Sequence, residues 1–388
     1  MTVEKRLQSL FLLYMDSPRR RAVLKESLYS RGDNYLLFGL EEYQAAGLGV
    51  RHNLETPRRS SRAVHFLSRM INKSLRAYGG IGGDFRSVIA CRQQMNRSDV
   101  ILSTVDPVGI PLALCKAKGV INRPALYTSV GFPERIPRFR TSRAEIAYRE
   151  MFGQMDGFIG YGYEECSLLR TWLNKEDDDF VHFVPFGVDV DYFSASATRV
   201  KTETNVLTIG ADPNRDFPLL FALAKARPEY SIEIVTSKDH MQRWDKVPGN
   251  VKVLCDIPLA HMKDRMEAST AVLLPIKENS YSGATTTLLQ AMAMEKPVIV
   301  SRVGAIRDGY HLKDGCNCLL VRPGNKEEFI RKTDLLLSNT RLQKSLADNA
   351  CKTIRQNLTW KHYVNSMQSV LKYCYREHTI RNIRSLSS

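Results

Sequence analysis

Short apolar runs alternate with helical patterns from one end of the chain to the other. In the first half these runs cover residues 10–15, 99–105, 125–130, 157–162 and 180–186. Strands that alternate with helices form parallel sheets, because a parallel neighbour is reached only through a long crossover connection. The sequence therefore predicts an α/β fold in which functional side chains follow the carboxyl ends of the strands.

The alternation restarts after a break near residue 194. The stretch 194–204 is small and polar without an apolar period, and the strands that follow cover 205–210, 231–237, 251–257, 271–276, 297–301 and 318–321. Helical patterns cover 217–230, 285–296 and nearly all of 325–372. We therefore predict two Rossmann-like domains, 1–193 and 205–358, joined by a linker, 194–204. A C-terminal helical segment, 359–388, is expected to cross back to the first domain.

The composition limits the partners and the compartment. Lys and Arg number 56 against 41 Asp and Glu, and a net charge of +15 suits nucleic acid, an anionic membrane or a phosphorylated substrate. The eight cysteines form no CxxC pair, which argues against zinc ribbons and secreted disulfide scaffolds. Gln8, Ser9 and Asp16 interrupt the first apolar stretch, which indicates a strand rather than a signal peptide. Since no 18 apolar residues run together, we expect a cytoplasmic protein with at most peripheral membrane contact.

The segment 271–301 carries the clearest chemistry. A buried strand is followed by a polar loop, by a helix that begins at a run of threonines, and by a strand opened by Pro297. Free N–H groups at a helix start bind anions, and the hydroxyls of Ser282, Thr285 and Thr286 add donors that suit a diphosphate. Gly283 permits close approach of the backbone. A plain capped helix has the same pattern, so this segment alone leaves both interpretations open.

Four segments in order resemble family-4 retaining glycosyltransferases of the GT-B fold. The segment 271–301, with LLQAMAMEKPVIVS, is similar to the family's loop, its helix ending in EAMA and its GKPVI-type strand. Three further blocks match FVPFGVDVDYF (183–193), IGADPNRDFPLLFALAKARPEY (209–230) and VGAIRDGYHLKDGCNCLLVRPGNKEEF (303–329). The resemblance covers nearly all of 185–372. It implies two Rossmann-like domains facing a cleft, an acceptor in the first domain, a nucleotide-sugar as donor substrate in the second, and no cofactor.

The resemblance also assigns residues of the donor site, although this sequence departs from the family's pattern at several positions. It implies donor contacts at Gly210, Arg215, Ile257, Ser282, Gly283, Ala284, Thr285, Thr286 and Gln290. The family's arginine after the first donor-domain glycine is replaced by Ala211, and its lysine falls near Arg215, which we expect to neutralise the leaving diphosphate unless it is a solvated loop arginine. The family's paired glutamates fall at Ser282 and Gln290, so Glu278 is considered as a catalytic carboxylate, with a solvated loop glutamate as the alternative. No DxD motif or His/Cys cluster stands nearby, and no metal is expected.

The first half offers acceptor contacts that are less specific. The segment YTSVGFPER (127–135) lies where relatives carry a histidine near the reaction centre, and the candidates there are Tyr127, Ser129, Glu134 and Arg135. The loop DSPRRR (16–21) follows the first strand and adds Ser17 and Arg19. A strand end with a Gly-Phe-Pro turn explains the same residues without an acceptor.

Positive charge is concentrated in residues 51–140, with 16 Lys and Arg against 5 Asp and Glu. Leu67, Met70, Ile71 and Leu75 recur at helical spacing among arginines that include Arg51, Arg58, Arg59, Arg62, Arg69, Arg76, Arg138 and Arg140. This pattern predicts a basic amphipathic surface for anionic lipid headgroups, or a solvated helix packed on its own domain.

The sequence as a whole favours a metal-independent retaining glycosyltransferase of glycan, polysaccharide or glycolipid synthesis. A catalytically silent GT-B protein that binds a nucleotide or a polyanion is the main alternative, because both family glutamates are replaced. A nucleic-acid binder is a weaker alternative, since the arginines are not interleaved with aromatic residues and no nucleic-acid motif is present. A GT-B epimerase of nucleotide-sugars is also weaker, because the PFGVD and LLQAMA blocks resemble transferases more closely. The basic first half points to a phosphorylated, lipid-linked or membrane-held acceptor.

Overall fold

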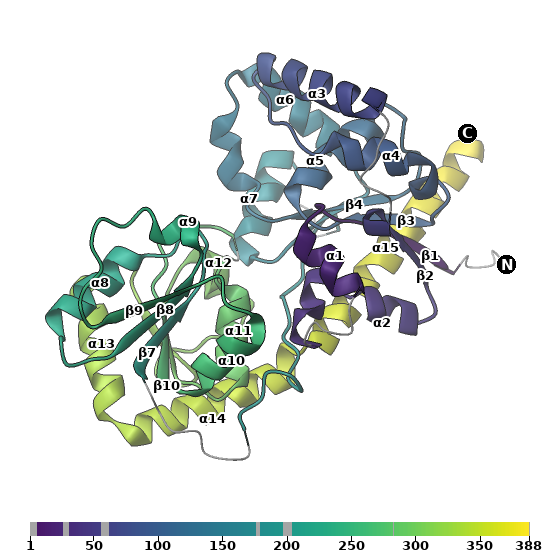
Figure 1. Ribbon diagram of the computed structural model, residues 1–388. Coiled ribbons are helices and arrows are strands. Elements are labelled where there is room, and N and C mark those ends of the chain that lie inside the picture. The colour runs from purple at the N-terminus through teal and green to yellow at the C-terminus, as the bar shows by residue number, and fades with distance from the viewer. Residues whose placement is uncertain are drawn as a thin grey trace. The chain divides into compact units, whose positions relative to one another are not determined.

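A computed structural model describes residues 6–25, 31–55, 62–175, 179–196, 204–281 and 283–387. The chain divides into two compact units. The first unit takes the described residues within 1–29, 34–184 and 364–388, and the second takes those within 30–33 and 185–363. Each unit is built on its own sheet (Figure 1).

The first unit contains a six-stranded parallel sheet in the order β2-β1-β3-β4-β5-β6. The strands are β1 (Ser9–Leu13), β2 (Gly49–His52), β3 (Val100–Ser103), β4 (Ala125–Ser129), β5 (Gly157–Gly160) and β6 (Val181–Phe183). The α-helices are α1 (Pro18–Lys25), α2 (Leu40–Ala45), α3 (Arg62–Ala77), α4 (Phe85–Met95), α5 (Asp106–Ala117), α6 (Ser142–Phe152) and α7 (Tyr163–Leu173). Short 3₁₀ helices occupy η1 (Arg31–Leu37), η2 (Asn53–Glu55) and η3 (Pro133–Arg138).

Aromatic packing holds the middle of this unit together. Phe132 and Phe152 lie 4.8 Å apart between ring centroids, and Tyr127 and Phe158 lie 4.9 Å apart. Strands β3, β4 and β5 are buried along their whole length, which is typical of parallel strands covered by helices on both faces. The carboxyl ends of these strands are therefore fixed by a rigid core.

The second unit contains another six-stranded parallel sheet, in the order β12-β11-β10-β7-β8-β9. Its strands are β7 (Thr204–Ile209), β8 (Ile232–Thr236), β9 (Val251–Cys255), β10 (Ser269–Leu274), β11 (Val298–Ser301) and β12 (Leu319–Val321). Its helices are α8 (Phe217–Ala226), α9 (Lys238–Met241), α10 (Leu259–Glu267), α11 (Thr285–Ala293), α12 (Gly304–Arg307), α13 (Lys326–Ser338) and α14 (Thr340–Asn357).

The last helix, α15 (Trp360–Ser387), belongs to both units. Its first four residues lie in the second unit, where Trp360 and Tyr363 pack against Phe186. From Val364 onward it lies in the first unit, where it buries Met367 and Leu371 among other residues. The prediction that the C-terminal helices return to the first domain therefore agrees with this division.

One prediction from the sequence needs correction, and one strand was missed. The boundary expected at residue 193 lies at Val184 and Pro185 instead, because Phe186 already packs in the second unit. Strand β2 was not predicted, because GVRH at a sheet edge has a mixed burial pattern and no apolar run. The linker expected at 194–204 lies mostly outside the described residues.

The α/β architecture of two Rossmann-like domains is confirmed. No α-helix in the described part of the chain has both the length and the apolar character needed to cross a membrane.

Candidate functional site

The central site of the second unit lies where strands β7 and β10 run side by side. From this pair the chain continues to β8 and β9 on one side and to β11 and β12 on the other. Ligands of open parallel sheets bind at the carboxyl ends of the strands at such a switch point. Gly210 follows β7, and the segment 275–281 follows β10.

Arg215 is fixed between these two segments. The backbone N–H of Lys277 donates to the carbonyl of Asn214 at 2.8 Å, and that of Asp216 donates to Pro275 at 2.9 Å. These bonds place Arg215 opposite Ile276 in an antiparallel bridge. A side chain on Gly210, whose φ is +150°, would collide with the guanidinium group, so glycine is required there.

The guanidinium group of Arg215 is buried with unused donors. Only 3% of the residue is exposed, and its Nη2 donates a long bond of 3.4 Å to Oγ1 of Thr287. Neither Nε nor Nη1 has an acceptor within the described residues. Burial lowers the pKa of Arg215 to about 10, although the nearby carboxylate of Asp212 acts in the opposite direction. A buried cation with free N–H groups is suited to an anionic ligand.

The start of helix α11 adds further donors. Its N-cap is Ala284, whose methyl group cannot accept hydrogen bonds from the first N–H groups. The hydroxyl of Thr285 is buried and has no partner in the described structure, whereas Thr286 is half-buried. Gln290, on the same helix, is buried. Ser282 lies outside the described residues. The helix start and Arg215 together present unused N–H and O–H donors to one site.

Asp212 is a component of this site that sequence reasoning missed. Its Oδ2 accepts a 2.6 Å hydrogen bond from the hydroxyl of Tyr281, and its Oδ1 accepts one of 2.8 Å from the backbone N–H of Asn214. A Cβ built on Gly283 would lie 2.5 Å from Oδ2. The carboxylate therefore covers Gly283, next to the start of α11. The Asp-Pro-Asn sequence, typical of an Asx-turn, was the available signal.

His240 was also not predicted as a site residue. Ile257, which was predicted as a donor contact, lies elsewhere on the sheet. Both ring nitrogens of His240 are buried without partners among the described residues, and its pKa is lowered by burial and by Arg243. Its ring packs on Phe217, with centroids 5.3 Å apart. Ile257 is half-buried after β9, and β8 separates that strand from β7.

Glu278, predicted as a catalytic carboxylate, has a structural partner. Its Oε1 accepts a 3.1 Å hydrogen bond from the backbone N–H of Gly304, the first residue of α12. A carboxylate at that position satisfies an end group of the helix. Within the described ranges, no group of three or more His, Cys, Asp or Glu side chains is placed to hold a metal ion.

In the first unit, the predicted acceptor residues after β4 belong to a buried polar cluster. The hydroxyl of Tyr127 donates to Oδ1 of Asp106 at 2.9 Å, and Arg135 forms a 3.3 Å ion pair with Oδ2 of that residue. Burial raises the pKa of Asp106, while Arg135 opposes the shift. Since Tyr127 is fully buried among aromatic rings, we correct its expected role from acceptor contact to support of Asp106.

Ser129 has a second acidic partner. Its hydroxyl donates to Oε1 of Glu165 at 2.5 Å, and the backbone N–H of Gly131 donates to the same oxygen at 2.6 Å. Oε2 of Glu165 is buried without a partner in the described structure, and burial raises the pKa of this carboxyl to about 8. Ser129 is itself buried, so its role is also corrected to a positioning one. Glu134, by contrast, is exposed.

The loop after β1 places its predicted residues differently. The hydroxyl of Ser17 accepts a 3.2 Å bond from the N–H of Arg20 at the start of α1. Arg19 is exposed, whereas Arg20 is buried and donates to the carbonyls of Met15 and Leu36. The exposed Arg19 is therefore the arginine of this pair that solvent reaches.

Comparison with known proteins shows what the second unit is similar to. Residues 189–339 match the family model described as Glycosyl transferases group 1. This part of the second unit is therefore similar to the group 1 glycosyl transferases. A curated relative of this GT-B protein, an MMP alpha-(1->4)-mannosyltransferase from Mycolicibacterium hassiacum, is 25% identical over 190 residues. That match covers 47% of the chain and 45% of the relative, so the chain spans about half the length of the curated relative that it matches.

Solved structures share the fold of the GT-B protein over nearly its whole length. Sucrose-phosphate synthase from Thermosynechococcus elongatus has a TM-score of 0.69 at 14% identity, covering 94% of this chain and 98% of that one. HepE from Anabaena, solved with UDP, has a TM-score of 0.65 at 15% identity, covering 94% and 99%. The predicted resemblance to GT-B glycosyltransferases is thereby confirmed at the level of the fold and of the second unit.

Proposed function

We propose that this protein is a glycosyltransferase that moves a sugar from a nucleoside-diphosphate sugar to an acceptor hydroxyl, with retention of the anomeric configuration. The observation that carries the proposal is Arg215, buried with two groups of unused N–H donors beside the uncapped start of α11. A diphosphate supplies the acceptors that these groups lack. The proposal is supported by the similarity to group 1 glycosyl transferases, by HepE solved with UDP-glucose and by the mannosyltransferase relative.

The chemistry required of these residues is electrostatic. As the bond between the sugar and the diphosphate breaks, negative charge grows on the leaving phosphate oxygen, and Arg215, the α11 amides and Thr285 stabilise it. The same oxygen accepts the proton of the attacking hydroxyl, so no enzyme carboxylate has to act as base. We propose that this donor set performs the reaction without a metal ion, with Gly210, Gly283, Ala284, Thr286 and Gln290 as further donor contacts. Ile257, which β8 separates from β7, is kept as a weaker proposal.

We propose that the first unit binds the acceptor. Glu134, Arg135, Ser17 and Arg19 remain the proposed contacts, because none of them is fully buried. The excess of 16 basic over 5 acidic residues in 51–140 favours an acceptor that carries phosphate, is lipid-linked or is held at an anionic membrane. Such an acceptor fits synthesis of a glycan or a glycolipid at a cytoplasmic surface.

Thermal shift with nucleotides tests the donor site. Ligand at 100 times its dissociation constant stabilises the native state by about 2.7 kcal/mol. We expect one of UDP, GDP and ADP to raise the melting temperature, and Arg215→Gln to abolish the rise. Arg331→Gln, which removes an exposed arginine from α13, is the matched control. If no nucleotide raises the melting temperature, the proposed donor site is wrong.

Product analysis tests the reaction itself. Transfer from the nucleotide-sugar that binds is followed by NMR, which reports the anomeric configuration of the new bond, in buffer with and without a chelator. We expect the anomeric configuration to be retained both with and without the chelator. An inverted product contradicts the retaining mechanism, and loss of transfer in chelator contradicts metal independence.

A catalytically silent nucleotide-binding protein is the second candidate function. It is favoured by the hydrogen bond that occupies Glu278 and by the neutral Gln290 at a position where the resembling family has glutamate. Glu278→Gln tests whether this carboxylate acts in catalysis. Unchanged turnover would exclude the catalytic role that the sequence predicted for it. Nucleotide binding without transfer or hydrolysis of any nucleotide-sugar selects the silent protein.

A further inference from the structure

Helix α3 is attached to the first unit along a narrow strip. Of its 16 residues, only Ser68 is buried. Asn72 fixes the helix by donating to the carbonyl of Gly83 at 3.0 Å and accepting from its N–H at 2.9 Å, while Leu75 packs against the core. The helix therefore uses one side for attachment and leaves the remaining surface to solvent.

The solvent-facing side of α3 is apolar where a soluble helix is normally polar. Phe66 is 66% exposed, which is the highest value among the large apolar side chains of the described residues. Leu67 and Met70 are 47% and 46% exposed. Phe66 and Met70 are four residues apart and so share a face, which places them in one row. Of the four apolar residues that the sequence analysis grouped, Leu67 and Met70 point outward, and Ile71 and Leu75 are half-buried.

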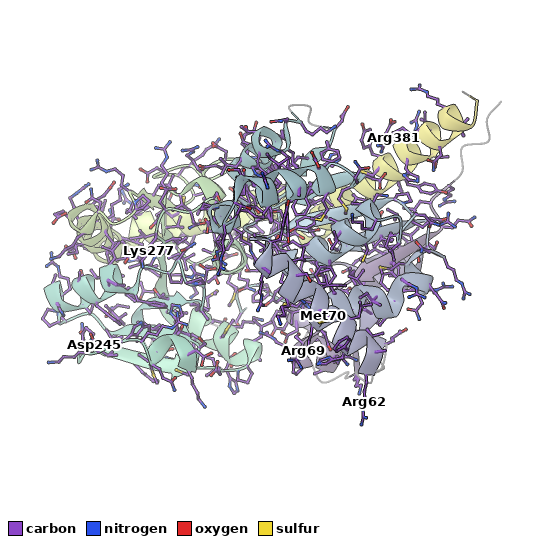
Figure 2. The ribbon with its side chains drawn as sticks, turned by 90° about the horizontal axis from the view of Figure 1, so that it is seen from above. Arg62, Arg69, Met70, Asp245, Lys277 and Arg381 are labelled. Carbon is purple, nitrogen blue, oxygen red and sulfur yellow. The ribbon has the colours of Figure 1, made fainter. Side chains whose placement is uncertain are left out.

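A cationic cavity lies beside this row. Its volume is about 280 Å³, and its lining consists of Arg62, His65, Phe66 and Arg69 from α3 and Arg86 from α4. No acidic side chain lines it. None of the three guanidinium groups forms an ion pair with another described residue. Figure 2 shows Arg62, Arg69 and Met70 along the same outer helix of the first unit.

The combination identifies the class of partner. Arginine binds phosphate through two parallel hydrogen bonds, and an apolar row beside a basic row is the arrangement of helices that lie in a membrane interface. A second copy of this face would bring the arginines of both copies together, which like-charge repulsion opposes. Single-stranded nucleic acid is bound on successive aromatic platforms, whereas Phe66 is the single Phe, Tyr or Trp of α3.

We propose that α3 and Arg86 form a docking site for anionic phospholipid membranes. Arg62, Arg69 and Arg86 hold the lipid phosphates, and Phe66, Leu67 and Met70 enter the boundary between headgroups and acyl chains. This docking site deepens the proposed function, since it rests on the proposal of an acceptor held at an anionic membrane.

Co-sedimentation with vesicles tests the docking site without any nucleotide or acceptor. The vesicles are phosphatidylcholine with roughly 30% phosphatidylglycerol, and pure phosphatidylcholine vesicles serve as the neutral arm. We expect salt-sensitive binding to the anionic vesicles alone. Each basic residue near an anionic surface contributes about a fivefold change in affinity, so Arg62→Gln/Arg69→Gln/Arg86→Gln should weaken binding by roughly a hundredfold. Phe66→Ser/Met70→Ser should weaken it at every salt concentration.

Matched variants control for charge and hydrophobicity. Arg331→Gln/Arg341→Gln/Lys344→Gln removes three exposed charges from α13 and α14, and Ile146→Ser/Leu335→Ser removes two exposed apolar side chains. Both should bind as the unaltered protein does. Because the altered side chains of α3 are exposed and that of Arg86 on α4 is half-buried, the melting temperature of every variant should stay within a few degrees of the original.

Four results overturn the docking site. The first is no binding to anionic vesicles at low salt, and the second is equal loss in the α3 variants and in their controls. The third is a dimer in sedimentation velocity that Phe66→Ser/Met70→Ser dissociates, without vesicle binding, which assigns the face to a second copy. Free inorganic phosphate that displaces the protein from vesicles at concentrations too low for screening also contradicts a membrane partner. The vesicle experiment contains no nucleotide-sugar, so its result does not depend on glycosyl transfer. Transfer can therefore fail while docking holds, and docking can fail while transfer holds.

Discussion

The hydroxyl of Tyr281 donates a 2.6 Å hydrogen bond to Oδ2 of Asp212, which holds a carboxylate against Gly283. The same carboxylate raises the pKa of Arg215, in opposition to burial. Asp212 therefore supplies negative charge to a site whose other groups are donors. A diphosphate that binds to Arg215 and the start of α11 has to share these groups with Asp212.

Asp212→Asn should bind nucleoside diphosphate more tightly than the unaltered protein. Asparagine keeps one oxygen as the acceptor for the N–H of Asn214, and its amide N–H can donate to the hydroxyl of Tyr281, while the charge that repels phosphate is removed. The expected gain is about 1–2 kcal/mol, or roughly 5- to 30-fold in affinity. Isothermal titration with the nucleotide identified by thermal shift measures it. Asp348→Asn, an exposed position on α14, is the control, and weaker binding in Asp212→Asn alone would mean that the carboxylate helps the ligand.

Gly210→Ala should weaken nucleotide binding and destabilise the second unit. The new methyl group meets the Arg215 guanidinium, and the φ of +150° is unfavourable for alanine. A cost of about 1–3 kcal/mol in the free energy of unfolding is expected. Gly249→Ala is a matched control, because a Cβ there has no heavy atom within 4 Å. Calorimetry compares the two variants, and equal stability would show that Arg215 moves aside freely.

Stability of the first unit should fall as pH rises between about 5 and 8. Burial raises the pKa of Glu165 from an ordinary value of 4.5 to about 8, so the folded state holds a proton that the unfolded state releases in this window. The contribution is present below the unfolded pKa and lost as pH passes the folded one, with a slope of at most about 1.4 kcal/mol per pH unit.

The variant Glu165→Gln isolates this contribution. The amide oxygen of glutamine can still accept from Ser129 and Gly131 but does not titrate. Asp106 and His52 also titrate with altered pKa, so the quantity to measure is the difference in melting temperature between Glu165→Gln and the unaltered protein across pH. The variant should gain relative stability as pH rises. A constant difference would refute the raised pKa.

Leu371→Ala should destabilise the first unit although residue 371 lies far along the chain. Its side chain is fully buried in that unit, and such truncations cost about 2–5 kcal/mol. Hydrogen exchange should locate the loss in the strands β3 to β6. Lys372→Ala, at the exposed neighbouring position, should leave exchange unchanged. Loss of protection confined to β7–β12 would contradict the assignment of α15 to the first unit.

Periodicity was enough to predict the sheets but not every strand. Eleven of the strands have apolar runs, such as VILS in β3, since both faces of a parallel sheet are covered. Strand β2 lies at an edge with one buried residue and lacks that signal. The division at Val184 was missed because it depends on the packing of Phe186 against Trp360, more than 170 residues away, which no local pattern contains.

The proposed donor site rests on sequence motifs at Arg215 and at the start of α11. Asp212 was missed because its position over Gly283 depends on a bond with Tyr281 across two loops. Tyr127 and Ser129 were expected to face an acceptor because strand ends often do. Their hydroxyls instead bond Asp106 and Glu165, acidic partners that arise from two different helices.

The division of α15 between the units also sets an order of folding during synthesis. The second unit is almost entirely contiguous, from 185 to 363, whereas the first needs residues 364–388, which leave the ribosome after it. We therefore expect the first unit to keep the surface that packs on Met367 and Leu371 open until α15 is made, while the second unit can already close its core. On the ribosome, the half of the chain that is made first is the half that is finished last.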